Sequence, residues 1–267
     1  MGSTEPAQLS YSAPPEAVTF DGLLFDMDGT IIDSTDAVVK HWETIGKEIG
    51  VDPKVILETS HGRRTIDTLQ LLAPAKANWE CCQASTQTTD PPSHTDVRET
   101  EGRLPKLYGD DAVEIPGARP LLEGLIAQSA PWTIVTSGSL PLVTGWLNVL
   151  QLPSPPHLVT AESVTNGKPD PACYQLGRER LGVSSSVSSD GEGAQVLVLE
   201  DSPAGIRSGK AAGCKVLAVV TSHTAEQVLA AEPDWVVRDL ASLRLVRVEG
   251  GRVTLEIRDA LVVAGAQ

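Results

Sequence analysis

The chain has 267 residues, a length that fits one large domain or a domain with a smaller insert. With 41% hydrophobic and 21% charged residues, the composition is ordinary for a soluble globular protein. The formal net charge of −14, from 21 Lys and Arg against 35 Asp and Glu, argues against nucleic acid or an anionic membrane surface as the main partner. The 4 cysteines are too scattered for a disulfide framework and form no CxxC zinc motif.

The start of the chain lacks the features of a targeting signal. Residues 1–17 have neither a basic start nor an apolar core, and Pro6 stands where a myristoylation motif needs Ser or Thr. No apolar run approaches the ~18 residues that a membrane span needs. We therefore expect a disordered tail over residues 1–17 and a cytoplasmic protein that makes no membrane contact. The acidic surface favours a monomer.

The first structured elements follow this tail. The apolar run at 18–26 predicts a strand, and residues 28–30 are typical of a turn. A helix is predicted from Ser34 or Thr35 to Ile49, with Gly50 as its stop. From there to Tyr108 the pattern is helical, without a convincing strand. The apolar face of the first helix consists of Val38, Trp42, Ile45 and Ile49.

A different rhythm begins after Pro116, where strands alternate with helices. One helix is predicted to have Ser202 as its N-cap and Pro203 at its first position. The last elements form a hairpin that turns on Gly250 and Gly251. The strands of the alternating region are predicted at 132–137, 157–162, 195–201, 215–221 and 234–240.

Alternating strands and helices predict the α/β class, with a Rossmann-like, doubly wound parallel sheet. The strands are nearly continuous apolar runs, as burial on both faces requires. The helical block after the first strand interrupts this pattern, so we interpret it as an inserted α-helical cap domain. The expected division is a core at 18–34 and 113–267, with a cap at 35–112.

Polar residues stand where four of the predicted strands end. Residues 26–30 (Asp-Met-Asp-Gly-Thr) follow the first strand and residues 136–138 (Thr-Ser-Gly) the second. Lys168 comes after the third strand, and Glu200-Asp201 end the fourth. Because ligands of such sheets bind outside the carboxyl ends of the strands, we expect these side chains to converge.

This set of residue types is suited to phosphate chemistry. Clustered carboxylates repel one another unless a cation neutralises them, and oxygen ligands without His or Cys favour Mg²⁺. Lys168 and the turn that contains Thr136 and Ser137 can bind a phosphate by charge and by backbone N–H groups. Asp26 can then act as a covalent nucleophile, and Asp28 as a general acid and base.

The segments FDMDGT, TSG, GKPDP and LEDSPAGI resemble the four motifs of the haloacid dehalogenase superfamily, in order, over about residues 18–240. This resemblance implies that Asp26 forms an aspartyl-phosphate, and that Asp28 protonates the leaving alcohol and then deprotonates water. It also implies that Thr136 and Lys168 hold the phosphoryl group. The implied Mg²⁺ ligands are the Asp26 carboxylate, the Asp28 backbone carbonyl and Asp201, with Glu200 assisting.

Further segments, among them TSHGRRTIDTL and DSPAGIRSGKAAGCK, resemble fungal 2-deoxyglucose-6-phosphate phosphatases and glycerol-phosphate phosphatases. Residues 79–103 depart from both. The resemblance implies His61 and Arg64 as substrate-binding residues, whereas Arg63 falls at a variable position. We therefore expect a Mg²⁺-dependent phosphatase of small sugar or polyol phosphates, with substrates like 2-deoxyglucose 6-phosphate favoured over glycerol phosphate.

Three alternatives use the same scaffold. A sugar phosphomutase would share every motif and return the phosphate to a sugar. A dehalogenase has no alcohol leaving group to protonate, so Asp28 counts against it. A non-catalytic binding protein is expected to have lost part of the motif set, which is complete here.

Overall fold

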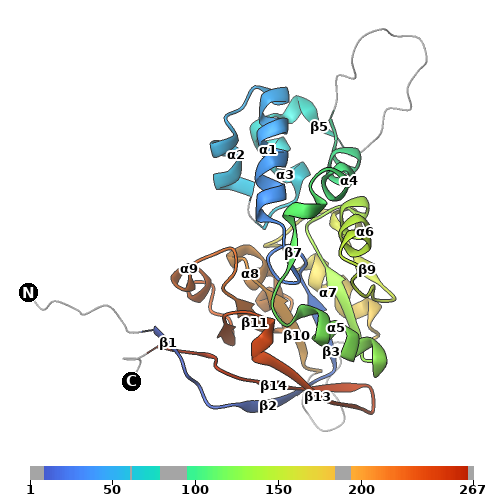
Figure 1. Ribbon diagram of the computed structural model, residues 1–267, viewed down its shortest axis with the longest axis vertical. Coiled ribbons are helices and arrows are strands. Elements are labelled where there is room, and N and C mark those ends of the chain that lie inside the picture. The colour runs from blue at the N-terminus through green and yellow to red at the C-terminus, as the bar shows by residue number, and fades with distance from the viewer. Residues whose placement is uncertain (1–8, 61, 79–94, 184–193, 264–267) are drawn as a thin grey trace, which may run out of the picture.

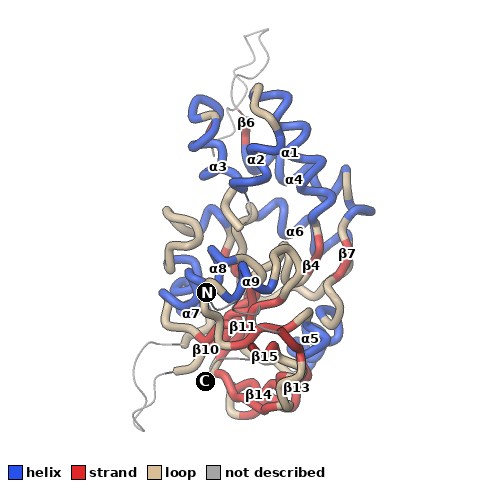
Figure 2. Tube along the Cα trace, turned by 90° about the vertical axis from the view of Figure 1, so that its left-hand side faces the viewer, coloured by secondary structure: helices blue, strands red, loops and turns tan. Residues whose placement is uncertain are grey.

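The computed structural model describes residues 9–60, 62–78, 95–183 and 194–263. The chain forms a helical part that stands on a larger part containing the central sheet, as Figures 1 and 2 show from two directions. His61, residues 184–193 and most of the 79–103 segment lie outside the described residues. Within the described ranges, every helix is too short or too polar for a membrane span.

The larger part is built on a parallel sheet of six strands, which confirms the predicted α/β class. Every neighbouring pair in this sheet is parallel. The order across the sheet places the first strand of the sheet, β3, in the middle. In spatial order the strands are β12 (Trp235–Val237), β11 (Lys215–Val219), β10 (Val196–Glu200), β3 (Gly22–Phe25), β8 (Trp132–Val135) and β9 (Leu158–Val159).

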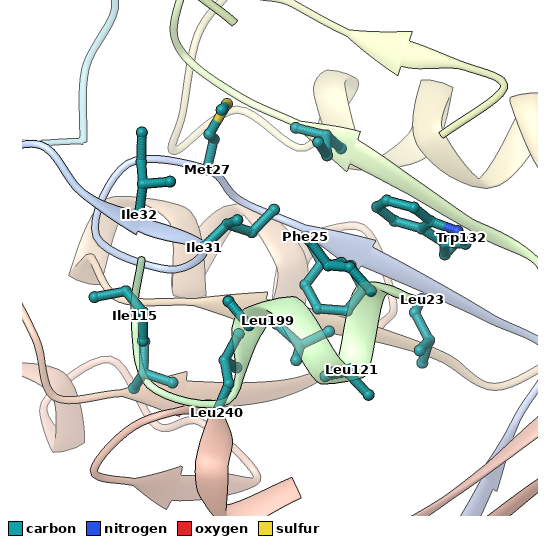
Figure 3. Packing of buried hydrophobic residues seen from close by; sticks show 14 of the residues in the cluster. Leu23, Phe25, Met27, Ile31, Ile32, Ile115, Leu121, Trp132, Leu199 and Leu240 are labelled. Atoms are coloured by element: carbon teal, nitrogen blue, oxygen red, sulfur yellow. The ribbon is translucent and has the colours of Figure 1, made fainter. Parts of the chain in front are cut away.

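Each face of the sheet has its own buried core. Leu23 and Phe25 of β3 point to one face and Leu24 to the other, because successive side chains of a strand alternate. Figure 3 shows the first face, where Phe25 packs edge-on against Trp132 with ring centroids 5.8 Å apart. The helices of this part are α5 (Ala118–Ala127), α6 (Leu140–Val149), α7 (Ala172–Arg180), α8 (Pro203–Ala211) and α9 (Ala225–Leu229).

The predicted strand at 18–26 is wrong in one respect, because it divides into two strands of different sheets. β2 (Glu16–Phe20) joins the C-terminal hairpin of β13 (Leu243–Glu249) and β14 (Arg252–Ile257), whereas β3 enters the central sheet. The chain bends at Asp21. This bend lets β2 bury Phe20 against the hairpin while β3 buries Leu23 to Phe25 in the central sheet. One straight strand could not do both.

The expected disordered tail is also wrong for residues 9–17. β1 (Leu9–Tyr11) pairs antiparallel with β15 (Leu261–Val263), and β2 begins at Glu16. The partner strand lies at the far end of the sequence, so no local pattern around Leu9 could reveal the pairing. Residues 1–8 lie outside the described residues.

The helical part consists of α1 (Thr35–Ile49), α2 (Pro53–Ser60), α3 (Thr65–Leu72) and α4 (Val97–Leu107). It has its own small core, to which α1 contributes Trp42 and Ile45. The predicted first helix is confirmed, and Gly50 ends it at φ 73°. One short strand pair was not expected there, β5 (Ala77–Asn78) with β6 (Thr95–Asp96). Short 3₁₀ helices complete the chain at η1 (Pro74–Lys76), η2 (Gly109–Asp111), η3 (Ala161–Ser163) and η4 (Leu240–Ser242).

The two connections between the parts lie side by side. β4 (Ile32–Asp33) leaves the core and pairs antiparallel with β7 (Val113–Glu114), which returns to it. Its two strands come directly before and directly after the helical segment in the sequence. We propose on this basis that residues 35–112 act as a cap domain inserted into the core.

His41 of α1 generates a prediction about stability. Its side chain is buried, and its Nε2 atom has no hydrogen-bond partner among the described residues. Burial lowers the pKa of His41 from 6.5 to about 4. Between those two values the unfolded chain binds the proton and the folded chain does not, so stability falls as pH drops through this window.

We expect His41→Phe to remove this part of the pH dependence while keeping the ring contact with Trp42. The loss of unfolding free energy between pH 7.5 and pH 5 should be smaller in the variant by about 2 kcal/mol. Urea denaturation at the two pH values measures it. Equal pH dependence in both proteins would show that His41 does not titrate as described.

Candidate active site

The residues predicted at the strand ends lie together at the carboxyl edge of the central sheet. Asp26 follows β3, Thr136 follows β8 and Asp201 follows β10, while Lys168 reaches them from the loop before α7. All four residues are buried. The parallel order of the sheet produces this arrangement, because it brings the C-terminal ends of its central strands to one edge.

Lys168 is the centre of the cluster. Its Nζ lies 2.5 Å from Asp26 Oδ1 and 2.8 Å from Glu200 Oε1, and donates to the backbone carbonyl of Val135 at 3.2 Å. Burial by itself lowers the pKa of Lys168, but the charges of Asp26 and Glu200 outweigh it and raise that pKa. The ammonium group therefore stays charged in the interior.

Glu200 pairs with this lysine, and both of its carboxylate oxygens accept further hydrogen bonds. Oε1 accepts from the Tyr174 hydroxyl at 2.9 Å, and Oε2 accepts the backbone N–H groups of Asp201 and Ser202, both at 2.9 Å. A Cβ at position 205 would lie 1.6 Å from Oε1, so Gly205 leaves the room that the carboxylate needs. These bonds favour a positioning role for Glu200 over direct contact with a metal.

Asp26 and Asp201 have the geometry of cation ligands. Together with Glu200 they offer oxygen atoms within 4.8 Å of one another. Burial and then the charge of Glu200 raise the pKa of both, that of Asp26 to about 7. The close approach requires Gly29 at φ 86°, because a Cβ there would lie 2.2 Å from Asp201 Oδ2. Crowded buried carboxylates of this kind fit a hard divalent cation such as Mg²⁺.

Asp28 lies two residues after Asp26 and lines the same cavity. The Ser34 hydroxyl donates to Asp28 Oδ1 at 2.5 Å and fixes the orientation of the carboxyl group. Burial raises the pKa of Asp28, and the Ser34 hydrogen bond opposes this shift. A carboxyl group that is held in place and has a raised pKa is suited to proton transfer.

A cavity of about 140 Å³ lies above these residues, between the core and the helical part. Asp26, Asp28, Thr136 and Ser137 line its core side. The Ser137 hydroxyl also donates a hydrogen bond to the Gly62 carbonyl at 3.1 Å. Side chains of the helical part form the remaining wall. These residues include Val38, Trp42, Leu57, Arg63 and Glu101.

Arg64 does not line this cavity but a smaller pocket beside it, together with Thr136 and Lys168, so its role as a substrate-binding residue stays a prediction. Its guanidinium is buried and donates two hydrogen bonds to the Asp67 carboxylate, at 2.7 and 2.8 Å. It donates three more bonds to backbone carbonyls of the core, which fills its donor capacity. Those carbonyls belong to Ala161, Val164 and Thr165.

The neighbouring Arg63, which falls at the variable position and was not predicted to bind substrate, is exposed and lines the cavity. Glu101 was missed as well, because it lies next to an irregular polar stretch with no recognisable motif. The adjacent arginines have opposite environments although both lie in the turn before α3, with Arg64 at its N-cap, and no local pattern distinguishes them. His61 lies outside the described residues.

The two arginines give a matched pair for a stability test. We expect Arg64→Met to lower the free energy of unfolding by about 2–3 kcal/mol, because it leaves Asp67 and three carbonyls without their charged donor. Arg63→Met should change it by less than about 0.5 kcal/mol. Urea denaturation of both variants measures the difference, and equal losses would contradict the assignment of Arg64 as a structural residue.

Comparison with known families gives one family match over most of the chain. Residues 20–213 match the model of the haloacid dehalogenase-like hydrolases. Among solved structures, a hydrolase from Pseudomonas syringae has a similar fold, with a TM-score of 0.64 and 20% identity, covering 82% of this chain and 94% of its own.

Several curated relatives are phosphatases of sugars or polyols. Glycerol-1-phosphate phosphohydrolase 1 of Saccharomyces cerevisiae is 34% identical over 239 residues, 89% of each chain. Hexitol phosphatase A of Escherichia coli is 34% identical over 235 residues, 88% of this chain and 98% of its own. 2-Deoxyglucose-6-phosphate phosphatase 1 of S. cerevisiae is 30% identical over 254 residues, 91% and 98% of the two chains.

Proposed function

Since the chain belongs to the haloacid dehalogenase-like hydrolases and is a phosphoric monoester hydrolase, we propose that it hydrolyses small sugar or polyol phosphates with Mg²⁺, through an aspartyl-phosphate. The observation that carries this proposal is the buried contact of Lys168 with Asp26 beneath the cavity. In this contact the Lys168 ammonium group lies next to the Asp26 carboxylate, which lines a cavity large enough for a small molecule.

We propose that the Asp26 carboxylate, the Asp28 backbone carbonyl and the Asp201 carboxylate hold Mg²⁺, with Glu200 supporting the site through Lys168. The oxygen-only donor set and the crowding of the carboxylates support this choice of metal. Bound Mg²⁺ would neutralise these charges and polarise a phosphate oxygen.

The two aspartates divide the chemistry. An Asp26 oxygen forms a bond to phosphorus while the bond from phosphorus to the leaving alcohol oxygen breaks, and Asp28 gives that oxygen its proton. In the second step water attacks the phosphorus, Asp28 takes the water proton, and phosphate leaves Asp26. Lys168 and the Thr136 hydroxyl hold the phosphoryl oxygens during both steps.

The cavity supports a small substrate. About 140 Å³ suits a body of a few carbon atoms more than a polymer. Substrates like 2-deoxyglucose 6-phosphate stay within the proposal, and the higher identity to the glycerol and hexitol phosphatases gives polyol phosphates equal standing.

We also propose that the protein acts as a cytoplasmic monomer. Cys173 and Cys214 are buried free thiols, as is usual for a reducing compartment. A free small-molecule substrate requires no partner surface, and the acidic composition disfavours nucleic acid.

The test is phosphate release from a panel of glycerol, hexitol, hexose and 2-deoxyhexose phosphates, with Mg²⁺ and after its removal with EDTA. We expect release from part of the panel, loss with EDTA and recovery when Mg²⁺ is restored. Asp26→Asn should lower kcat by about 10³-fold or more, because the amide cannot attack phosphorus.

Asp33→Asn is the matched control, because Asp33 lies on β4 and its carboxylate accepts only the nearby Thr35 N–H at 3.0 Å within the described contacts. We expect near wild-type activity from it. Full activity in Asp26→Asn would refute the covalent mechanism. Conversion of sugar 1-phosphates to 6-phosphates without phosphate release would instead establish a phosphomutase.

A further inference from the structure

Glu101 is a buried carboxylate of the helical part that faces the cavity. It lies on α4, is 3% exposed, and lines the same space as Asp26 and Asp28. Its Oε2 accepts the backbone N–H of Ser139 at 2.7 Å, across the boundary between the helical part and the core. Figure 1 shows α4 directly above α6, the helix that Ser139 precedes.

Two carboxylates accept N–H groups at the N-terminal end of α6, each from a different residue. Glu162 of the core already accepts the N–H of Leu140, the next residue of the same helix end, at 3.1 and 3.2 Å. Glu162 is exposed and is not among the described residues that line the cavity. The helix end thus has one carboxylate in solvent and a second, Glu101, inside the cavity.

Keeping Glu101 in the interior is unfavourable. Burial, opposed by hydrogen bonds from Ser139 and Thr65, raises the pKa of Glu101 to about 7. The charge of Asp28 adds to the rise, so the two carboxylates interact across the cavity. Buried carboxylates that line a cavity and have a shifted pKa are typical of functional sites.

The rest of the cavity wall suggests what that ligand part is. Val38, Trp42 and Leu57 present apolar surface beside Glu101, which suits a carbon skeleton. A hydroxyl on that skeleton can donate to a carboxylate, whereas a second anionic group would be repelled by Glu101 and Asp28 at short range. The guanidinium of Arg63 also lines the cavity, but it is exposed, so water and salt screen its charge.

We propose that Glu101 is a specificity-determining residue, which accepts hydrogen bonds from substrate hydroxyls and selects monophosphates with an uncharged, hydroxylated body over those with a second negative charge. This proposal rests on the proposed phosphatase function. According to this proposal, α4 of the helical part discriminates between substrates, whereas the motif residues of the core act on the phosphate group that all of them share.

The test compares Glu101→Gln with Glu162→Gln on glycerol 1-phosphate and 2-phosphoglycolate, with Mg²⁺ at pH 8, where Glu101 is charged. Glutamine keeps the shape and can still accept the Ser139 N–H through its carbonyl oxygen. For Glu101→Gln we expect kcat/KM to fall about 10-fold on glycerol 1-phosphate and to rise on 2-phosphoglycolate. Glu162→Gln should leave the ratio of the two values unchanged.

A merely structural role would lower both values in parallel, so an unchanged ratio in active Glu101→Gln overturns the proposal. Glu101→Asp is the second variant if the glutamine protein does not fold: it keeps the charge, so we expect continued rejection of 2-phosphoglycolate with weaker use of glycerol 1-phosphate. Efficient use of 2-phosphoglycolate by that variant would equally refute the proposal. Failure of the phosphatase function itself differs from both, because the wild-type protein would then release no phosphate from any panel member.

Discussion

The buried ammonium group of Lys168 is the contact on which the arrangement of the site depends. It neutralises part of the charge that Asp26 and Glu200 bring into the interior, and it fixes their side chains relative to each other. Without it, adjacent carboxylates at the ends of β3 and β10 would repel each other at the centre of the sheet. The glycines beside these groups serve the same arrangement, because Gly205 and Gly29 leave space for Glu200 and Asp201.

The sequence allowed the core of the site to be predicted because two regularities coincide there. Continuous apolar runs locate the ends of β3, β8 and β10, and a parallel sheet places such ends on one edge. The split of residues 16–25 into β2 and β3, and the pairing of β1, could not be predicted, because both depend on strands near the other end of the chain. Local patterns carry no information about such distant partners.

The helical part was predicted as a set of helices but not in its contacts. Arg63 and Arg64 are chemically identical and adjacent, yet one faces the cavity and the other is bonded to core carbonyls. Their environments depend on how α3 sits on the core, which is a tertiary property. The contacts of Arg64, Glu101 and Ser137 between the two parts also show that the cavity wall and the attachment of the helices involve the same segments. A substitution in this wall would therefore also affect how the helical part is attached to the core.

The antiparallel pairing of β1 with β15 brings the two ends of the described chain together, on the side of the molecule away from the helical part (Figure 1). Neighbouring ends are the geometry that circular permutation requires, since a short linker can join them without crossing the fold. New ends could then be opened in an exposed turn such as Gly250-Gly251, also remote from the cavity. The fold thus separates the region where the polypeptide could be cut and rejoined from the cavity where we propose that phosphate chemistry takes place.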